Sequence, residues 1–538
     1  MAVDIARALV AHKDACGWLI GMLRASTMLW TLFAIAVGMA GWRVVYALYF
    51  SPLRHIPGPL LSRVTGKRLE VEALLGRFAK YGKKYSEKYG DINVCQPNSV
   101  CIADPADIRR VLSSPLMLKD SYYTLLRFTG IDNTISTTRP DEASKARRML
   151  GPHFSTSYLN RMEPLIMEFG ARAIVRRWDA LVARSADGAA TVNYAHAFGL
   201  CTFNVVSRLV YGQDIAALDP DSSGAELQWV QKSTMFVSMR TILQLLPRPL
   251  FRLLTLPWDH MFQRFYNHVG ESIAARRQLL DALGPEDERP ADLLQALLDC
   301  EDPGSRVHLN SEQIHAESLL LLIGGIDPTA FTLIWTTHLL LLYPACYQRA
   351  VDEVRSRFPP QGDAVITHAA ARGALPYLEA CILESMRLIP VPSVMIPRVV
   401  CGPGITIKGH HLPPGTRIFA DMYGSHMSQR HWTDPHRFDP ERFLAPGSRL
   451  SHCVFTFGYG TRICMGKQLA WMNMLTIMAS LLRRYDFALP KGHTRTGPTV
   501  IDPATGYPKI MAMTHLLSRK PACPDADCLV TITRAGAT

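Results

Sequence analysis

The chain has 538 residues, of which 48% are hydrophobic and 19% are charged, so it can bury a large core and is not a disordered chain. Its net charge is +12, but the basic residues are spread along the chain without a long run, which disfavours nucleic acid as the main partner. Its 12 cysteines include no C-x-x-C pair, and this pattern favours reduced thiols in a cytosol-facing domain over a secreted disulfide framework.

The first long apolar stretch covers residues 26–50 and contains a single charged residue, Arg43. A helix of this length can cross the roughly 30 Å hydrocarbon layer of a membrane. We therefore predict a transmembrane helix over 26–50, preceded by a non-cytosolic segment over 1–25. A cleaved signal peptide and a buried core helix are the alternatives. Basic residues after the stretch, such as Arg54 and Lys67, favour a cytosolic body.

Residues 51–60 contain Pro52, Pro57 and Pro59. Proline fixes φ and lacks an amide proton, so this segment is predicted to be a stiff, extended linker between the membrane and the body. From residue 61 to residue 520 there is neither a second linker nor an internal repeat, and we expect one domain.

Helical patterns dominate this domain, and its strand-like pieces are short. The clearest helical patterns cover Leu319–Leu342, Tyr377–Leu388 and Lys467–Tyr485, and the strand-like pieces cover Ile92–Cys95, Val100–Ile102, Ile405–Ile407 and Thr416–Ala420. The predicted fold class is mainly α with small β-sheets. The C-terminal tail, 521–538, has no amphipathic period and is expected to be loosely ordered.

A glutamate and an arginine share one helix face in Glu384-Ser-Met-Arg387. Residues three apart on a helix are neighbours, so the carboxylate and the guanidinium can pair. Alone, this spacing is a weak signal, because most such pairs lie at the surface and contribute little.

The stretch Phe457-Gly-Tyr-Gly-Thr-Arg-Ile-Cys-Met-Gly466 carries the strongest chemical signal. Its glycines let the backbone turn tightly and approach a flat cofactor. A helix predicted to begin near Lys467 places its positive end beside the sulfur of Cys464 and favours a thiolate. Arg462 adds a cation that can neutralise a carboxylate. A thiolate is one of the axial ligands that proteins give to haem iron.

The cysteine loop resembles the haem-binding signature of the cytochrome P450 family, F-x-x-G-x-R-x-C-x-G. The matching residues are Phe457, Gly460, Arg462, Cys464 and Gly466. The resemblance covers roughly residues 50 to 520, in the family's motif order. The residues around the motifs are similar to those of fungal membrane-bound members. It implies the cytochrome P450 fold and heme b whose iron is ligated by the Cys464 thiolate.

The resemblance also assigns roles to other charged residues. It implies a structural cluster of Glu384, Arg387 and Arg442 that braces the cysteine loop. It implies that Arg147 and Arg398 meet the haem propionates. Family members often have an aromatic residue or histidine four positions before the first of these arginines, and this chain has Ala143 there, so one propionate contact is expected to be missing.

The helix that faces the oxygen side in this family departs from the usual pattern here. The chain reads Gly324-Gly-Ile-Asp-Pro-Thr-Ala330, with Asp327 where a proton-relay acid is expected and Pro328 where a threonine usually stands. Proline cannot donate to the carbonyl four residues back. Our hypothesis is that Pro328 opens the groove for water and that Thr329 or ordered water delivers protons. The competing interpretation is that oxygen activation is impaired or unnecessary.

Four segments are predicted, by analogy, to line the substrate pocket. They are Tyr122–Ser136, Met235–Leu246, Pro390–Met395 and Pro503–Tyr507. Their aliphatic and aromatic content predicts a mainly apolar pocket with few orienting groups.

The resemblance implies a monooxygenase that uses O2 to oxidise a small hydrophobic molecule, of terpenoid, polyketide or indole type, in fungal secondary metabolism. It implies NADPH–cytochrome P450 reductase as the electron donor, cytochrome b5 as an optional further partner, and an endoplasmic reticulum membrane location with a cytosolic catalytic domain. The alternatives are a haem-thiolate isomerase or dehydratase that needs no reductase, and a non-catalytic haem-binding protein.

Overall fold

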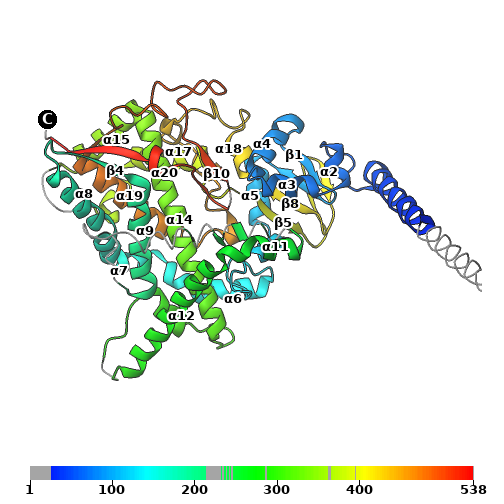
Figure 1. The fold of residues 1–538 in the computed structure, drawn as a ribbon, viewed down its shortest axis with the longest axis horizontal. Helices are drawn as coiled ribbons and strands as arrows, with labels where there is room; N and C mark the ends of the chain where they lie inside the picture. The colour runs from blue at the N-terminus through cyan, green and yellow to red at the C-terminus, as the bar shows by residue number, and fades with distance from the viewer. Residues whose placement is uncertain are drawn as a thin grey trace, which may run out of the picture.

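A large helical region and a smaller region built on a sheet lie side by side, and an N-terminal helix projects away from the sheet region (Figure 1). The computed structural model describes residues 26–213, 246–284, 287–360, 365–393, 395–515 and 517–536, with positions 218, 232, 236, 237, 239, 240 and 243 between them. The prediction of a mainly α fold with small β-sheets is confirmed.

The helices, in chain order, are α2 (Leu60–Val64), α3 (Lys67–Leu74), α4 (Phe78–Tyr89), α5 (Pro105–Ser113), α6 (Pro140–Leu150), α7 (Thr156–Ile166), α8 (Ala173–Arg184), α9 (Tyr194–Tyr211), α11 (Arg248–Thr255), α12 (Asp259–Ala282), α13 (Leu293–Asp299), α14 (Ser311–Leu342), α15 (Pro344–Arg357), α16 (His368–Ala371), α17 (Pro376–Leu388), α18 (Met422–His426), α19 (Lys467–Arg484) and α20 (Pro524–Asp527). The strands are β1 (Ile92–Gln96), β2 (Ser99–Ile102), β3 (Met117–Lys119), β4 (Ala189–Asn193), β5 (Ile396–Val400), β6 (Ile405–Ile407), β7 (His410–Leu412), β8 (Arg417–Ala420), β9 (Tyr485–Ala488), β10 (Met513–His515), β11 (Arg519–Pro521) and β12 (Leu529–Arg534).

The longest helix, α14, runs through the helical region (Figure 1). It begins with a capping box, in which Asn310 and Gln313 each satisfy a backbone N–H of the first turn. Gly325 lets α9 approach closely, because a Cβ atom at this position would lie 2.9 Å from Cγ2 of Val206. Pro328 does not end the helix, which continues to Leu342. The helix therefore forms a continuous wall through the core.

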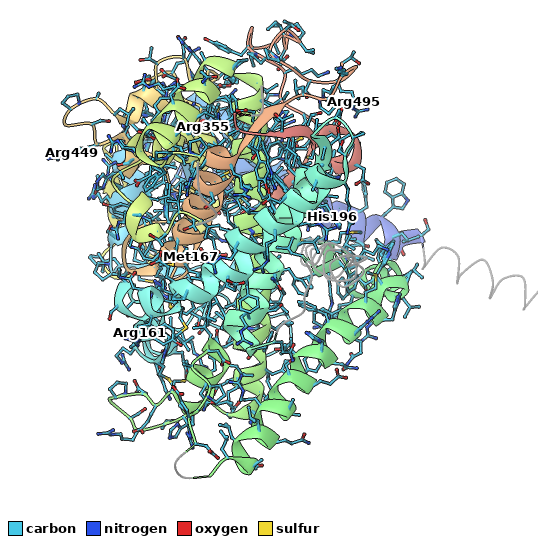
Figure 2. The ribbon with its side chains drawn as sticks, turned by 90° about the vertical axis from the view of Figure 1, so that its left-hand side faces the viewer. Arg161, Met167, His196, Arg355, Arg449 and Arg495 are labelled. Atoms are coloured by element: carbon cyan, nitrogen blue, oxygen red, sulfur yellow. The ribbon has the colours of Figure 1, made fainter. Side chains whose placement is uncertain are left out.

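The helices around α14 are joined by side chains that bond to helix ends. Arg355 of α15 donates to the carbonyl oxygens of Leu482 (3.1 Å) and Tyr485 (3.0 Å), where α19 ends (Figure 2). These carbonyls have no partner within the helix, so a cation there satisfies them and interacts favourably with the helix dipole. The contact fixes the far end of α19, whose first residue follows the cysteine loop.

The main sheet has the strand order β1-β2-β8-β5-β3. The β2–β8 pair is parallel, with Val100 opposite Ile418, and the other neighbours are antiparallel. The smaller sheets pair β6 with β7, β10 with β11, and β12 with both β4 and β9. The five-stranded sheet carries Lys119 on β3 and Arg398 on β5 as direct neighbours.

The linker prediction for residues 51–60 is wrong in its geometry. The chain turns at residues 52–55, and Leu53 and Ile56 are each only 1% exposed, packed in the core under the main sheet. Val94 of β1 donates its N–H to the carbonyl of Pro57 at 2.8 Å. Apolar side chains beside the prolines make docking more favourable than an extended spacer. The segment is part of the domain.

The expectation of a loosely ordered tail is also wrong. Strand β12 lies between β4 and β9, with Ile532 opposite both Ala190 and Phe487. Val530 and Ile532 are fully buried. Their period-2 alternation with Thr531 and Thr533 is a strand signal that a search for helical periodicity overlooks.

The N-terminal helix covers Ser26–Phe50 and is long and apolar enough to cross a membrane. Its side chains are exposed, with Ala47 as the buried exception. Among the described residues, the other helix that passes the same test is α14, which is largely buried and belongs to the core. The predicted segment 1–25 lies outside the described residues.

Candidate functional site

The cysteine loop is folded back on itself by backbone hydrogen bonds. Cys464 donates its N–H to the carbonyl of Phe457 at 2.9 Å, and Gly458 donates to Phe455 at 2.8 Å. Gly460 has φ of 72°, and a Cβ atom there would lie 2.8 Å from Cα of Ser113 at the end of α5. Only glycine satisfies both the positive φ and this close approach. The loop is therefore held against α5.

The predicted iron ligand, Cys464, is surface-accessible, yet enough protein surrounds it that burial raises the pKa of its thiol. The Gly466 N–H, Arg147 and Lys467 act in the opposite direction. The expected N-terminal end of a helix lies at Lys467, capped by Gly466. The favourable charges at this helix end do not offset the effect of burial on the pKa of the Cys464 thiol. A coordinated metal ion deprotonates a thiol outright, so this site suits a bound cation.

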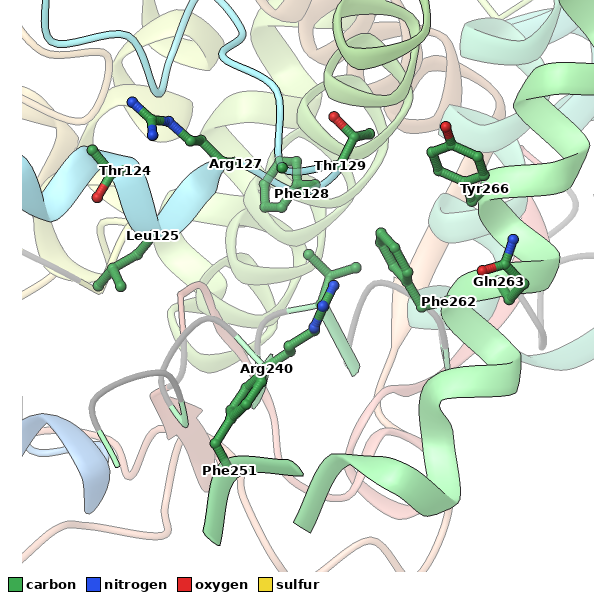
Figure 3. A pocket seen from close by; sticks show the side chains of 12 residues that line it. Thr124, Leu125, Arg127, Phe128, Thr129, Arg240, Phe251, Phe262, Gln263 and Tyr266 are labelled. Atoms are coloured by element: carbon green, nitrogen blue, oxygen red, sulfur yellow. The ribbon is translucent and has the colours of Figure 1, made fainter. Parts of the chain in front are cut away.

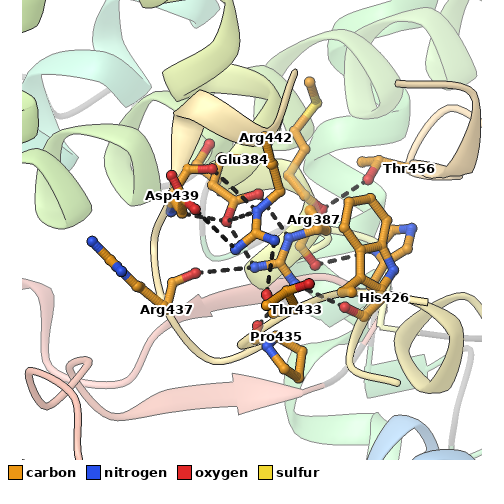
Figure 4. A network of polar contacts seen from close by, with 12 residues as sticks. Glu384, Arg387, His426, Thr433, Pro435, Arg437, Asp439, Arg442 and Thr456 are labelled. Carbon is orange, nitrogen blue, oxygen red and sulfur yellow. Dashed lines mark hydrogen bonds and ion pairs between the residues drawn. The ribbon is translucent and has the colours of Figure 1, made fainter. Parts of the chain in front are cut away.

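The Glu-Arg-Arg cluster forms as predicted from the resemblance (Figure 4). Arg387 donates in a bidentate way to Glu384, from Nε to Oε2 at 2.7 Å and from Nη2 to Oε1 at 2.8 Å. Arg442 Nε donates to the same Oε1 at 3.2 Å. Glu384 and Arg387 are both 0% exposed. Since a buried charge without its partner is costly, the three side chains hold one another in place.

The cluster reaches the cysteine loop through a histidine that sequence reasoning missed. His426 Nδ1 lies 3.1 Å from the carbonyl of Arg387, and the N–H of Phe455 donates to His426 Nε2 at 3.0 Å. Burial and the nearby Arg387 lower the pKa of His426 to about 3, so the ring is neutral. Its Nε2 accepts, and therefore its Nδ1 carries the proton. Thr456 adds a bond from Oγ1 to the carbonyl of Met386, at 3.0 Å.

A group of cations lies beside the loop. Burial, together with the neighbouring charges of Arg462, Arg398 and Arg147, lowers the pKa of Lys119 to about 7. Burial and the charges of Arg398 and Arg147 lower the pKa of Arg462. Arg147 donates to the carbonyl of Ile463 in the loop. The structure thus brings the three predicted arginines together around one point next to Cys464.

These cations fit a dianionic cofactor edge. Within the described part of the chain, none of the three arginines forms an ion pair with a carboxylate, although they repel one another. Two propionates would supply the missing negative charge, and a thiolate-forming cysteine lies beside them. The residues present therefore fit haem.

Lys119 and Tyr123 were not predicted to belong to this group. Arg398 Nη1 donates to the Tyr123 hydroxyl at 2.8 Å, and Lys119 Nζ lies 5.2 Å from the Tyr123 ring. The strand register of Lys119 opposite Arg398 is the signal that could have found them, but it requires the sheet order.

A carboxyl on α14 fastens the neighbouring loop. Oε1 of Glu317 accepts from the N–H of Thr134 at 2.6 Å and from its hydroxyl at 2.8 Å. On the other side of the loop, Lys119 Nζ donates to the carbonyls of Thr134 and Ile135, both at 2.9 Å. Burial raises the pKa of Glu317 to about 7. The carboxyl therefore keeps its proton to a higher pH than an exposed glutamate does.

The predicted oxygen-side residues lie on the middle of α14. Gly324 is exposed and nothing lies within 4 Å of a Cβ atom placed on it, so this turn opens on free space. Thr329 is buried, and Asp327 is half-buried and electrostatically coupled to Lys520 of β11. Thr332 Oγ1 donates to the carbonyl of Pro328 at 2.8 Å. This arrangement places Asp327 and Gly324 where water can reach them.

The comparisons with known proteins agree with this geometry. The model of the family described as Cytochrome P450 matches residues 56–500. The chain belongs to the cytochrome P450 family. It is 37% identical to cytochrome P450 monooxygenase helB1 of Aspergillus fumigatus over 95% of this chain and 87% of the relative. It is 36% identical to helB3 of the same fungus, over 95% and 99%. It is 29% identical to tpeC of Talaromyces stipitatus, over 85% and 88%.

Membership makes the chain a cytochrome P450 monooxygenase and implies haem held by a cysteine thiolate. The predicted resemblance to fungal members is confirmed. The roles of individual residues in this P450 remain predictions, supported by the geometry above.

Only some of the four segments predicted to line the substrate pocket lie at a pocket in the structure. A pocket of about 520 Å³ is lined by residues 124, 125 and 127–130, from the first predicted segment, and by Val237 and Arg240 from the second. The remainder of Met235–Leu246 lies mostly outside the described residues. Segments Pro390–Met395 and Pro503–Tyr507 do not line this pocket, whereas α11 and α12 do. The pocket also contains two arginines, and the composition of the substrate pocket remains a prediction.

Proposed function

We propose that this P450 is a membrane-anchored haem-thiolate monooxygenase that oxidises a small hydrophobic molecule of fungal secondary metabolism, of terpenoid, polyketide or indole type. Haem bound at Cys464 supplies the capacity to activate O2 so that one oxygen atom enters the substrate. Arg147, Arg398 and Arg462 bind the propionates. Phe457, Gly460 and Gly466 shape the loop around the ligand.

The single observation that carries this proposal is the group of cations beside Cys464. Three arginines converge beside Lys119 without an ion-pair partner of their own among the residues that the structure describes, and the reactive sulfur lies next to them. A protein that used Cys464 only for packing would have no need to gather uncompensated positive charge there.

The residues of α14 prepare the opposite side. Gly324 leaves room over the cofactor, and its carbonyl has no N–H donor at Pro328. This carbonyl can hold a water molecule. Asp327 exchanges protons with water, and Thr329 or that water hands them on. The glutamate-arginine cluster, Glu384, Arg387 and Arg442, acts only by holding the cysteine loop in place.

Electrons are proposed to come from NADPH through NADPH–cytochrome P450 reductase, with cytochrome b5 as an accessory donor. The net charge of +12 suits docking of an acidic partner. The exposed helix Ser26–Phe50 is proposed to anchor the chain in the endoplasmic reticulum membrane, with the catalytic domain in the cytosol.

The test uses microsomes that contain the full chain and a reductase. We expect an absorption band typical of thiolate ligation after reduction and treatment with carbon monoxide. With NADPH, ¹⁸O2 and an extract of a producing fungus, we expect one metabolite to gain a labelled oxygen atom. A band typical of imidazole-ligated haem would refute the ligand assignment, and labelled product without NADPH would refute the electron route.

Thr329→Ala tests the proton path. If Thr329 delivers protons, the variant consumes NADPH at a similar rate but releases more hydrogen peroxide and less product, by about 10-fold or more. Unchanged coupling would remove Thr329 from the path and leave ordered water.

Pro328 motivates the competing function, a haem-thiolate isomerase or dehydratase. Such an enzyme would convert a peroxide or a hydroxylated substrate without NADPH or reductase, and no ¹⁸O would enter the product. A non-catalytic haem-binding protein would show the thiolate band and no turnover with any donor. The labelled-oxygen experiment therefore separates all three functions.

A further inference from the structure

A pocket of about 520 Å³ lies between the segment 124–130, α11 and α12 (Figure 3). The segment begins directly after Tyr123, which bonds to Arg398, and α12 contacts α14 through the stacked rings of Tyr266 and His315, 3.9 Å apart. The pocket is thus connected on both sides to elements of the candidate site. Among the residues that the structure describes, no aspartate or glutamate lines it.

Aromatic side chains form its walls. Phe128, Phe251, Phe262 and Tyr266 all line the pocket, and Figure 3 shows Phe251 and Phe262 on either side of Arg240. Rings of this kind bury a large apolar surface and pack well against a flat or elongated hydrocarbon body. The walls therefore suit the apolar part of a ligand.

The two arginines of the pocket differ in their partners. Arg127 is bidentate to Asp132, from Nε to Oδ1 at 2.6 Å and from Nη2 to Oδ2 at 2.9 Å, so its charge is compensated. Arg240 has no carboxylate partner among the described residues, and its Nε is buried without a hydrogen-bond acceptor. It lies over the rings of Phe262, at 5.1 Å, and Phe251, at 6.0 Å.

Arg240 has an unused donor at its Nε. Stacking on aromatic faces uses the flat side of the guanidinium and leaves its in-plane N–H groups free for a planar, bidentate acceptor. A buried donor without an acceptor destabilises the protein, so the position favours a ligand that supplies one. A carboxylate has the matching charge and geometry.

We propose that this pocket recognises substrates that carry a carboxylate on an apolar body, with Arg240 binding the carboxylate and the aromatic walls holding the body. The inference rests on the proposed function in that the bound molecule is taken to be the substrate. Arg127 stabilises the segment 124–130 through its ion pair with Asp132, and Arg240 binds the carboxylate of the ligand.

The test measures binding to the haem-loaded full chain without reductase or NADPH. The probes are 6-phenylhexanoate and its neutral amide, 6-phenylhexanamide, titrated by calorimetry at pH 7.5. We expect the protein to bind the carboxylate about 10-fold more tightly than the amide, since hydrogen bonds to charged groups are stronger than neutral ones. Equal binding of the two probes by the unaltered protein overturns the inference.

Arg240→Gln should bind the amide as before and lose the preference for the carboxylate. The matched control is Arg252→Gln, which removes the same charge from an exposed position on α11 outside the pocket and should keep the full preference. A preference that survives Arg240→Gln overturns the assignment. If that variant binds neither probe, Arg240→Lys decides, because it retains the cation: a retained preference supports the inference and equal binding overturns it.

The carbon monoxide spectrum and turnover are recorded on the same preparations. Loss of the thiolate band or of NADPH-dependent product would refute the proposed function. The comparison of carboxylate and amide binding would still test the proposal for the pocket. Equal probe binding with a normal band and normal turnover would refute the pocket alone.

Discussion

The two sides of the candidate site are built by different means. The cysteine side is fastened by a buried charge cluster and a neutral histidine, with the charged carboxylate and guanidinium fully enclosed. The pocket proposed for the substrate is formed by a loop, two helices and aromatic walls, and it keeps an arginine that has no acidic partner among the described residues. The first side holds Cys464 in one fixed position, and the second keeps a hydrogen-bond donor of Arg240 that a ligand can use. Substitutions on the two sides should therefore differ in kind.

Loss of the proposed iron ligand should have the largest effect. Cys464→Ala removes the only thiol of the loop Phe457–Gly466 and should abolish the thiolate-type carbon monoxide band and all NADPH-dependent turnover. Cys523→Ala is the control, because Cys523 is also exposed and lies far from the loop in sequence. A Cys464→Ala protein with a normal band and normal turnover would contradict the whole interpretation of the cysteine side.

Breaking the buried cluster should come next. Glu384→Ala leaves Arg387 and Arg442 without their shared carboxylate, and we expect the free energy of unfolding to fall by about 3–5 kcal/mol, with faster loss of haem. Urea unfolding and haem-loss rates measure the two effects. A loss below about 1 kcal/mol would mean that the cluster does not brace the loop.

Glu317→Gln should have an intermediate effect that depends on pH. The pKa of Glu317 is raised from 4.5 to about 7 in the folded protein, so the parent loses stability as the pH rises from about 4.5 through 7. The glutamine keeps an oxygen for Thr134 and does not ionise. Relative to the parent, the variant should gain up to about 3 kcal/mol between pH 4.5 and pH 8.

The control for this pH effect is Glu312→Gln, at an exposed position in the first turn of the same helix. It should follow the parent at every pH. Unfolding free energies that keep a constant difference between the Glu317→Gln variant and the parent, from acid to alkaline pH, would show that this carboxyl ionises normally.

The smallest effect is expected at the surface. Glu441 pairs with Arg349 where both side chains are about half exposed, so Glu441→Ala should change the free energy of unfolding by no more than about 1 kcal/mol. The variant is the matched comparison for Glu384→Ala. Similar losses in the two variants would show that burial of the cluster does not matter.

The cysteine side could be predicted well from sequence because its information is local. Phe457 to Gly466 fall within ten residues, and Glu384 and Arg387 are one helical turn apart. The long helices were also found, since α17 ends at Leu388 as predicted and α14 ends at Leu342. Strong periodicity over many residues makes such elements the easiest to predict.

The rest depends on contacts between distant segments. Lys119 joins the arginines only because β3 pairs with β5, and Glu317 meets Thr134 across 183 residues. His426 carries no motif of its own. The docking of Leu53 and Ile56 under the sheet is likewise a tertiary effect that overrides the local stiffness of proline. No pattern in a single sequence shows such pairs.

The position of β12 matters for anyone who shortens this chain. The family match stops at residue 500, and a truncation there would look natural. It would remove the central strand of a three-stranded sheet and leave β4 and β9 with bare backbone edges. Bare edges invite other chains to add on, so the shortened product should form insoluble aggregates even when its haem site is intact. A tag placed after Arg534 avoids that hazard.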